Sequence, residues 1–394
     1  MLMLKYISIS IIILLIIFNL FLRIKFPFWS IQPVFHIYDL SHWIFSNKII
    51  DSELPRSNKY VKPLDIETYP VKNVPTDVAI KSAAFIKEHY LRNKYAEYNP
   101  EYDDIFNYLE TSTPSFLSVY SKPKLLHDKS ASIIDRDILG VITCRPLFIT
   151  FKNRKNVLSV NYVDNLCVHK ANRKQGIAPC LIQTHHYHIR HLNKSTKVCL
   201  FKREGEMTAI IPLTTYNTLT YEIDDFPKLK LEYASMKVLR ITNNNISLFK
   251  DFIKGYATKF DCVINTEIMT IIKLLKEENL IIYSLIENHN VYALYIFRNT
   301  PSFVDGKKGV ECIATINNCP HNDTFYNGFC STLRRIKRKH KKQLVWLENT
   351  SDSNTIIGFN ARHNVIHKTS CPTAFFLYNY ASYTYKNNSC LFIY

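Results

Sequence analysis

One short segment, residues 164–179, constrains the fold of this chain more than any other, because it joins a strand to a glycine-containing turn and then to a helix. Residues 157–168 are rich in β-branched and aromatic side chains, which is typical of a strand. The residues after the turn mix apolar and polar side chains behind a proline, which indicates a helix start. Between them lies Arg173-x-x-Gly176-x-Ala178, where small residues let backbone N–H groups close on a pyrophosphate. The segment therefore predicts, in outline, an acyl-CoA site.

Several motifs resemble known protein families. The loop alone resembles the R/Q-x-x-G-x-G/A loop of the GNAT acyltransferase superfamily, although an ordinary connection between a strand and a helix also produces this pattern. Residues 166–170, Leu-Cys-Val-His-Lys, with Ala-Pro at 178–179 look like the signature of glycylpeptide N-myristoyltransferases. Residues 28–34, Phe-Trp-Ser-Ile-Gln-Pro-Val, resemble that family's F-W-x-T-Q-P-V segment, and residues 376–380 resemble its Y-L-Y-N-W strand. The order of these motifs favours this family. Low glycine and abundant Ile, Asn, Lys and Tyr make the chain similar to divergent members from large DNA viruses.

The chain ends on an apolar run, residues 390–394, although frayed termini are usually polar. This ending favours a strand carried into the interior, where the α-carboxylate of Tyr394 would be placed for chemistry. A simple edge strand is the alternative.

The family resemblance implies an α/β (α+β) fold of two tandem GNAT-like domains, each a mixed twisted sheet flanked by helices. We expect an acyl-CoA-binding domain at residues 25–225 and a peptide-binding domain at 226–394. The alternation of helix-like and strand-like segments would by itself support only a two-domain α/β or α+β protein.

The resemblance also implies an activity, the transfer of a myristoyl group from myristoyl-CoA to the α-amine of an N-terminal glycine. The backbone N–H groups of Asn165 and Leu166 would form the oxyanion hole, and the carboxylate of Tyr394 would be the base. The implied peptide contacts are Asp164, Arg203 and Gly205. The implied CoA contacts are Phe26, Phe28, Trp29, Tyr90, Leu166, Cys167, Val168, Arg173, Lys174, Gln175, Gly176, Ile177 and Ala178.

Two departures from the family pattern affect this assignment. Asn165 stands where the family has phenylalanine, which a backbone oxyanion hole tolerates. Arg203-Glu204-Gly205 stands where the family has T-A-G, and an arginine would repel an ammonium unless Glu204 or Glu206 neutralises it. Two alternatives therefore stay open: a GNAT enzyme that transfers a short acyl group, and an inactive acyl-CoA- or lipid-binding protein at a membrane.

The N-terminal segment, residues 1–24, is predicted to be a transmembrane anchor. Its first 22 residues carry only Lys5 as a charged side chain, and about 20 apolar residues cross a bilayer as a helix. No small-residue cleavage site follows, which favours an uncleaved, single-pass anchor. The charges around the segment and the cytosolic location of acyl-CoA favour a catalytic part that faces the cytosol. A helix packed within the protein is the alternative.

The formal net charge of +17 raises the question of nucleic-acid binding, but no nucleic-acid-binding module is recognisable. The basic run at residues 334–342 is more simply the solvated face of a helix, which could also hold the protein on anionic lipid. The ten cysteines lack paired spacing, and we expect no metal, including at His185-His186-x-His188. The expected partners are proteins with an N-terminal glycine and membrane lipid, bound by a monomer.

Overall fold

The helices and strands are described here for residues 2–44, 47–91, 96–128, 131–154, 156–205, 208–231 and 235–394 of a computed structural model. The helices are α1 (Leu2–Lys25), α2 (Leu40–Ile44), α3 (Thr76–His89), α4 (Tyr102–Glu110), α5 (Ile177–Leu192), α6 (Ile246–Tyr256), α7 (Ile268–Lys276), α8 (Asn322–His340) and α9 (Ser353–Arg362). The strands are β1 (Lys48–Ile49), β2 (Ile66–Pro70), β3 (Ala96–Tyr98), β4 (Phe116–Asp128), β5 (Ala131–Phe151), β6 (Leu158–Val168), β7 (Val198–Glu204), β8 (Thr214–Glu222), β9 (Lys237–Arg240), β10 (Cys262–Asn265), β11 (Leu280–Glu287), β12 (Asn290–Arg298), β13 (Ser302–Val304), β14 (Lys307–Asn317), β15 (Leu344–Glu348), β16 (Thr369–Tyr378), β17 (Tyr380–Ala381) and β18 (Cys390–Ile393).

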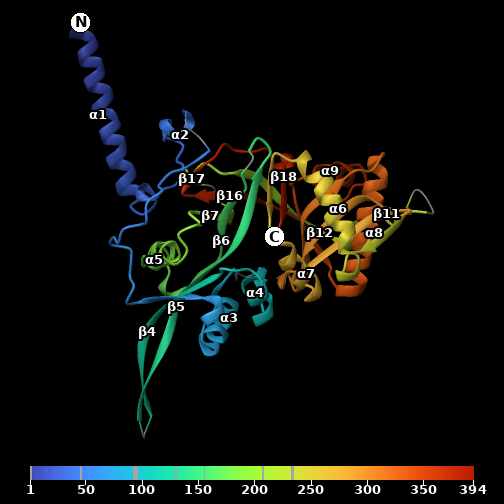
Figure 1. The fold of residues 1–394 in the computed structure, drawn as a ribbon, viewed down its shortest axis with the longest axis horizontal. Coiled ribbons are helices and arrows are strands. Elements are labelled where there is room, and N and C mark those ends of the chain that lie inside the picture. The colour runs from blue at the N-terminus through green and yellow to red at the C-terminus, as the bar shows by residue number, and fades with distance from the viewer. Residues whose placement is uncertain are drawn as a thin grey trace.

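A large twisted sheet runs through the molecule and is flanked by helices (Figure 1). Among the described residues it contains 16 strands, and its main path follows the order β18-β10-β5-β6-β7-β16-β8-β15-β14-β12-β11-β9. Most neighbours are antiparallel, but β6 with β7, β14 with β15 and β10 with β18 are parallel. The expected mixed α/β class with a twisted sheet flanked by helices is confirmed.

Strands from the two expected domains are interleaved in this sheet. β10 comes from the second expected domain but pairs with β5 of the first. β16, also from the second, lies between β7 and β8 of the first. The sheet is therefore continuous across the division at residue 225, and that division stays a prediction.

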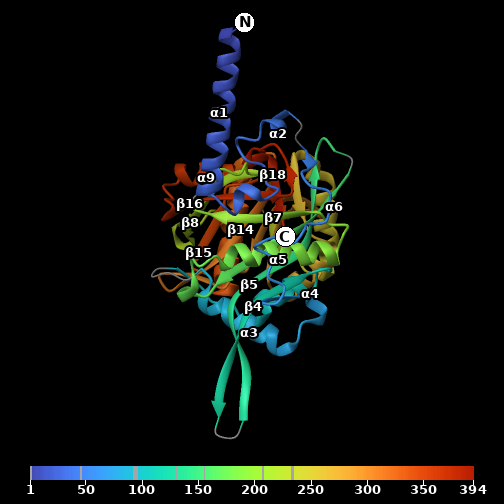
Figure 2. The ribbon, with the colours of Figure 1, turned by 90° about the vertical axis from the view of Figure 1, so that its left-hand side faces the viewer.

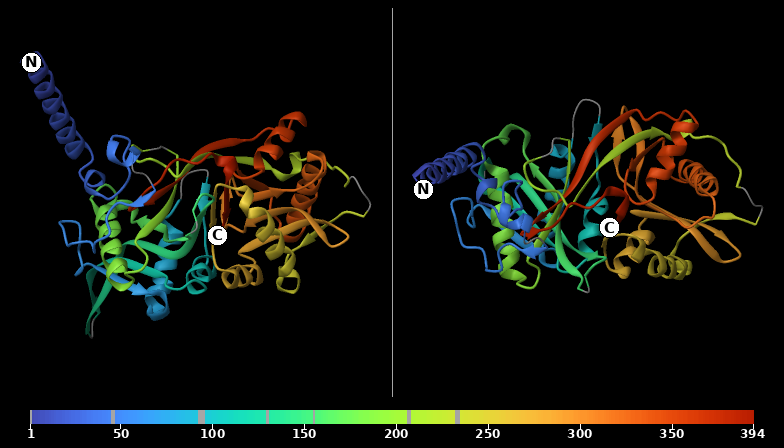
Figure 3. Two further views of the ribbon diagram at one scale, coloured as in Figure 1. Left: turned by 45° about the horizontal axis from the view of Figure 1, so that its top comes forward. Right: turned by 90° about the horizontal axis from the view of Figure 1, so that it is seen from above.

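The pleat of β11 shows how this sheet builds cores on both faces. Ile281, Tyr283 and Leu285 belong to a cluster that α8 and α9 cover. Leu280 and Ile282 alternate with them and pack against side chains of α6 and α7. Successive side chains of a strand point to opposite faces, so a strand covered on both sides is apolar throughout. Figure 3 shows these helices on either side of the strands.

The C-terminal strand β18 is carried into the interior. It pairs in parallel with β10, with Cys390 opposite Cys262 and Ile393 opposite Asn265. Residues 390–394 are all buried, and the C-terminus lies near the middle of the molecule (Figures 1 and 2). The apolar ending thus corresponds to a buried strand that closes one end of the sheet.

Some elements differ from the sequence-based expectation. The sequence at residues 116–120 and 139–151 is typical of strands, but β4 and β5 are longer because they continue as a hairpin that projects from the body (Figure 2). The strand β10 was not anticipated, since a run of four residues, three of them buried, gives too little periodicity to identify a strand. Helix α9, at residues 353–362, was also missed.

The N-terminal helix α1 projects away from the body, with the N-terminus at its far end (Figure 1). Ile11, Leu14 and Ile17 are exposed on it, whereas Leu22 near its end is buried. The prediction of a transmembrane helix at residues 1–24 is not supported: in the part of the chain that the structure describes, no helix has both the length and the apolar character needed to cross a bilayer.

Two helical glycines provide a test of the packing against β12. A Cβ on Gly328 of α8 would collide with the hydroxyl of Tyr295, which donates a hydrogen bond to the carbonyl oxygen of Phe325. A Cβ on Gly358 of α9 would meet no atom within 4 Å. We expect Gly328→Ala to lower the free energy of unfolding by about 1–3 kcal/mol through overpacking. The matched control Gly358→Ala should raise it by up to about 1 kcal/mol through helix propensity. Urea unfolding of both variants measures this, and equal stabilisation would contradict the packing of α8.

Candidate functional site

A cavity of about 1450 Å³ lies between α5, the segment after α3, and the strands from β5 to β15. Its lining has three chemically distinct sections. The loop section surrounds the turn at residues 172–179. The helix section follows the inner side of α5 and is largely apolar, with Trp29, Ile182, Ile189 and Phe201. The charged section consists of Arg145, Lys202, Arg203, Glu204, Arg298 and Glu311.

A β-bulge in β6 lies between the loop section and the charged section. Val141 of β5 pairs with Cys167, but Thr143 pairs with Asp164, so Asn165 and Leu166 together face a single residue of β5. Asn165 has a φ of 52°, in the left-handed region that asparagine adopts more readily than most residues. This backbone requirement gives a physical reason for asparagine at this position.

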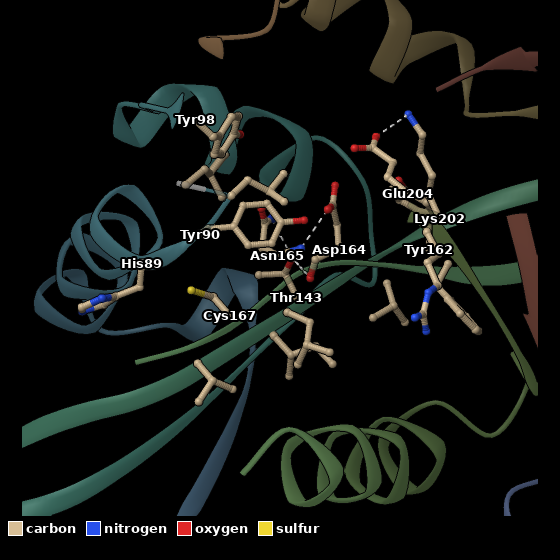
Figure 4. A pocket seen from close by; sticks show the side chains of 18 of the residues that line it. His89, Tyr90, Tyr98, Thr143, Tyr162, Asp164, Asn165, Cys167, Lys202 and Glu204 are labelled. Atoms are coloured by element: carbon tan, nitrogen blue, oxygen red, sulfur yellow. Dashed lines mark hydrogen bonds and ion pairs between the residues drawn. The ribbon is translucent and has the colours of Figure 1, made fainter. Parts of the chain in front are cut away.

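Hydrogen bonds fix the bulge in place. The Asn165 side-chain amide donates to Thr143 Oγ1 over 3.0 Å, and the Thr143 hydroxyl donates to the Asp164 carbonyl oxygen over 3.1 Å. The backbone N–H of Asn165 donates to the carboxylate of Asp164 over 2.8 Å. Figure 4 shows these side chains facing the cavity, with Tyr90 and Cys167 on one side and Lys202 and Glu204 on the other. A ligand carbonyl would therefore compete with Asp164 for the Asn165 N–H.

The loop section presents the N-terminus of α5 to the cavity. Gly176 immediately precedes α5 with a φ of 80°, and no atom lies within 4 Å of the position of a Cβ there. The Arg173 guanidinium donates to the carbonyl oxygen of His89 over 2.7 Å, which ties the turn to the end of α3. Lys174 is exposed beside it. The helix N-terminus and the open backbone at Gly176 together form a cradle suited to an anion.

Most of the residues implied by the family resemblance line this one cavity. Those that line it are Trp29, Tyr90, Asp164, Asn165, Leu166, Cys167, Val168, Arg173, Lys174, Gly176, Ile177, Ala178 and Arg203. Phe26, Phe28, Gln175, Gly205 and Tyr394 are outside the lining.

Those five residues lie nearby or behind the lining. Phe28 packs its ring edge-on against Trp29, with centroids 5.0 Å apart, and so supports a lining residue. Gln175 donates to the carbonyl oxygen of Ala171 within the turn, over 3.4 Å. Gly205 donates its N–H to the Pro372 carbonyl oxygen, over 2.8 Å, and Phe26 is exposed.

Tyr394 lies directly behind the cavity wall. It is 1% exposed, and its ring centroid lies 5.2 Å from that of Tyr162. The guanidinium carbons of Arg145 and Arg298 lie 5.7 Å and 5.4 Å from the Tyr394 ring. Tyr162 and both arginines line the cavity, so the Tyr394 ring packs behind the charged section, with these side chains between it and the cavity.

The charged section contains a buried ion cluster that the sequence did not reveal. Lys202 Nζ lies 2.9 Å from Glu311, 2.6 Å from Glu348 and 3.3 Å from Glu204. The Arg298 guanidinium also donates to Glu311, with Nε 2.7 Å from Oε2. Since these side chains come from four strands, β7, β12, β14 and β15, no local motif could have indicated the cluster.

Burial and pairing give the members of this cluster different charges. Burial raises the pKa of Glu348 to about 8, with the nearby Glu311 adding to the effect, so this carboxyl is protonated near neutral pH. Burial also acts to raise the pKa of Glu311, but Arg298 and Lys202 outweigh it and hold the pKa well below its usual value. Burial acts to lower the pKa of Lys202, but Glu311 and Glu348 together raise it. Lys202 and Glu311 are therefore an ion pair, and the carboxylate of Glu204, the residue after Arg203, lies beside Lys202. Glu206, the other acid considered for that role, lies outside the described residues.

Comparison with solved structures identifies the fold. No protein-family profile and no curated protein sequence matches the chain. Saccharomyces cerevisiae N-myristoyltransferase with bound myristoyl-CoA matches with a TM-score of 0.68 at 12% identity, over 92% of this chain and 94% of the yeast chain. A second structure of that yeast enzyme with myristoyl-CoA gives 0.67 at 13%, over 92% and 90%. A third, with myristoyl-CoA and inhibitors, gives 0.68 at 14%, over 94% of both chains. The chain therefore has a fold similar to that of yeast N-myristoyltransferase over nearly its whole length.

Proposed function

We propose that this protein is an N-acyltransferase that transfers a myristoyl group from myristoyl-CoA to the α-amine of an N-terminal glycine. One observation carries the proposal: a single cavity contains the β6 bulge, the Gly176 turn and the N-terminus of α5, on a fold whose yeast counterparts hold myristoyl-CoA. In this proposal the sheet is built from two GNAT-like halves, the first for acyl-CoA and the second for the peptide.

Each section of the cavity has a role in acyl-CoA binding. The N–H groups at the start of α5 and the backbone at Gly176 hold phosphate oxygens, with Lys174 adding positive charge. The path of the pantetheine and the acyl chain is lined by Trp29 and Tyr90, and Phe28 packs behind Trp29. The apolar helix section takes the acyl chain.

The transfer itself needs an oxyanion site and a base. The bulge leaves Asn165 and Leu166 out of one-to-one pairing with β5, so their N–H groups are the candidates to polarise the thioester carbonyl. The glycine amine loses a proton to the α-carboxylate of Tyr394 and attacks this carbonyl. Collapse of the tetrahedral intermediate breaks the C–S bond and releases CoA, whose thiolate takes up a proton. Asp164, Arg203 and Gly205 contact the peptide.

A second candidate is an inactive acyl-CoA-binding protein, which a specific contact favours. The Asp164 carboxylate already accepts a hydrogen bond from the Asn165 N–H, and in the charged section Lys202 already pairs with Glu311, a carboxylate that would otherwise attract an ammonium. This candidate predicts acyl-CoA binding without transfer to any peptide.

The C-terminus provides the most direct test of the enzymatic proposal. Appending a few residues after Tyr394 should lower the rate of glycyl-peptide acylation by roughly 10²–10⁴-fold, because a neutral amide replaces the carboxylate that acts as base. Acyl-CoA affinity should stay unchanged, since the acyl-CoA sections of the cavity lie elsewhere. Mass spectrometry of a peptide incubated with myristoyl-CoA measures the rate.

Three results would argue against parts of this proposal. An extended protein that acylates at the unextended rate would remove the carboxylate from the mechanism. Transfer of only short acyl groups would favour an ordinary GNAT enzyme. Binding of myristoyl-CoA without transfer by either form would support the inactive candidate.

Substitutions at two glycines with positive φ distinguish an effect on ligand affinity from an effect on stability. Gly176→Val should weaken acyl-CoA binding roughly tenfold or more, because the added side chain occupies the space where backbone N–H groups meet phosphate. Gly306→Val is a matched control, since Gly306 also has a positive φ, of 74°, and open space around its Cβ position. Both variants should lose about 1–2 kcal/mol of stability from the left-handed backbone. Calorimetric titration with myristoyl-CoA distinguishes them, and equal affinities would exclude the Gly176 turn from the site.

We also propose that α1 attaches the protein to a membrane from the cytosolic side, where it acts as a monomer. The exposed apolar side chains of α1 support this role, and the formal charge of +17 would add attraction to anionic lipid.

Removal of residues 1–22 tests this attachment. The truncated protein should no longer sediment with anionic vesicles at high salt, while its affinity for myristoyl-CoA should stay the same. Truncated protein that still sediments at high salt would refute attachment through α1. If the truncated protein sediments with vesicles at low salt only, the basic surface is responsible for that binding.

A further inference from the structure

Arg203 of β7 places an accessible cation in the cavity wall. It lines the charged section and is half-buried. Among the described residues, no hydrogen bond or ion pair joins its guanidinium to another group. Each of its nitrogens also keeps accessible surface, because none of them is among the buried polar atoms that lack a partner. The guanidinium is therefore open to a ligand in the cavity.

The acidic side chains of the charged section are engaged by other cations. Successive side chains of a strand alternate between its two faces, so Arg203 and Glu204 point to opposite sides of β7. Glu204 lies 3.3 Å from Lys202 Nζ. Glu311 is shared by Lys202 and Arg298. The carboxylates described in this section thus serve Lys202 and Arg298, and Arg203 is left without one.

Arg145 adds a second guanidinium that no carboxylate contacts among the described residues. It lines the same cavity, with its guanidinium carbon 5.0 Å from the Tyr108 ring and 5.2 Å from the Tyr162 ring. Aromatic faces attract a cation but carry no negative charge to neutralise it. Asp164 acts on Arg145 only at longer range, and its carboxylate accepts a hydrogen bond from the Asn165 N–H. This part of the cavity is therefore suited to an anionic group of a ligand.

The bulge and Arg203 lie on the diverging ends of β6 and β7. These parallel strands last pair at Val163 with Phe201. Asn165 and Arg203 each lie two residues beyond that pair, so their Cα atoms are at most about 18 Å apart. An extended peptide advances about 3.3–3.6 Å per residue. With the length of both side chains added, a carboxylate in one of the three residues after a glycine at the bulge can reach Arg203.

On the basis of the proposed function, we infer that the acceptor is an acidic glycyl peptide, in which an aspartate or glutamate among the three residues after the N-terminal glycine pairs with Arg203. A guanidinium binds a carboxylate through two parallel N–H···O bonds, which are stronger than bonds between neutral groups. The carboxylate also offsets the repulsion between Arg203 and the glycine amine. The α-carboxylate of Tyr394 does not take this role, because the proposed reaction assigns it to the amine. Peptides that are basic next to the glycine are disfavoured.

Calorimetry on the full-length protein, loaded with a non-cleavable thioether analogue of myristoyl-CoA, tests this inference. The probes are short neutral glycyl peptides with aspartate as the second, third or fourth residue, each compared with the asparagine peptide of the same sequence. At least one aspartate peptide should bind roughly tenfold or more tightly than its asparagine partner, because only aspartate supplies the charge. With myristoyl-CoA itself, the same peptide should be acylated with the lower KM.

Two variants of Arg203 distinguish its role from that of the overall positive charge. In Arg203→Gln the preference for aspartate should be lost. In Arg203→Glu it should reverse in favour of a peptide with lysine at the same position. In the matched control Arg335→Gln, which changes an exposed arginine of α8, the preference should persist.

The outcomes separate this inference from the function on which it rests. Equal or tighter binding by every asparagine partner, with acylation still present, would overturn the inference and leave the acyltransferase proposal in place. A preference for aspartate that persists in Arg203→Gln would also overturn it, because another cation would then hold the carboxylate. Binding of the acyl-CoA analogue without binding or acylation of any glycyl peptide would refute both. The comparison of peptides on the unaltered protein tests the preference even if a variant does not fold.

Discussion

The β-bulge at Asn165 is the constraint on which the rest of the site depends. A strand has a side-chain period of two, so one extra residue exchanges the faces of everything that follows it. In β6 the extra residue comes after Asp164, so Cys167 faces the cavity and the chain leaves the sheet in the direction that starts α5 beside it. Without the bulge the same residues would form an ordinary strand, and the Gly176 turn would begin from the other face. The Thr143–Asn165 hydrogen bond is what holds this geometry in a buried position.

The ion cluster around Lys202 is the second constraint, because it joins strands that are far apart in the sequence. Lys202 lies on β7, Glu311 on β14 and Glu348 on β15, and Arg298 reaches Glu311 from the adjacent β12. Replacing Glu311 by an uncharged residue would leave the buried Lys202 and Arg298 without the ionised carboxylate that they share, a loss of about 3–5 kcal/mol. The protonated Glu348 keeps the number of negative charges low. The cluster thus fixes the wall of the cavity where the two halves of the chain meet, at some cost in desolvation.

How much the sequence could predict depends on how local each feature is. The turn at Gly176 was predictable, because strand, glycine and helix start follow one another within a few residues. The overall class was predictable for the same reason, since β11, β12 and β14 carry long apolar runs. The ion cluster was not, because strand register across the sheet decides which charges meet.

The histidines of α5 show a different kind of limit. From the sequence, the only role considered for these histidines was metal binding, which we did not expect. Residues next to each other on a helix also do not normally share a face. His185 and His186 are both buried because α5 is covered on adjacent sides, by Ser118 of β4 and by Tyr378 of β16. Only the packing of α5 against both strands makes consecutive polar residues part of one lining.

The positive charge of the cavity is consistent with an amine acceptor once the proton balance of the proposed reaction is considered. A glycine ammonium cannot attack a thioester until it loses a proton, and nearby like charges disfavour the ammonium. Arg203, Arg298 and Arg145 all line the charged section, and among the described residues Glu311, the partly exposed Glu204 and the nearby Asp164 oppose them. This arrangement weakens the binding of the charged amine but increases the fraction that is neutral. In the proposed reaction, Arg203 would therefore lower the pKa of the bound glycine amine and make its deprotonation easier, at the expense of peptide affinity.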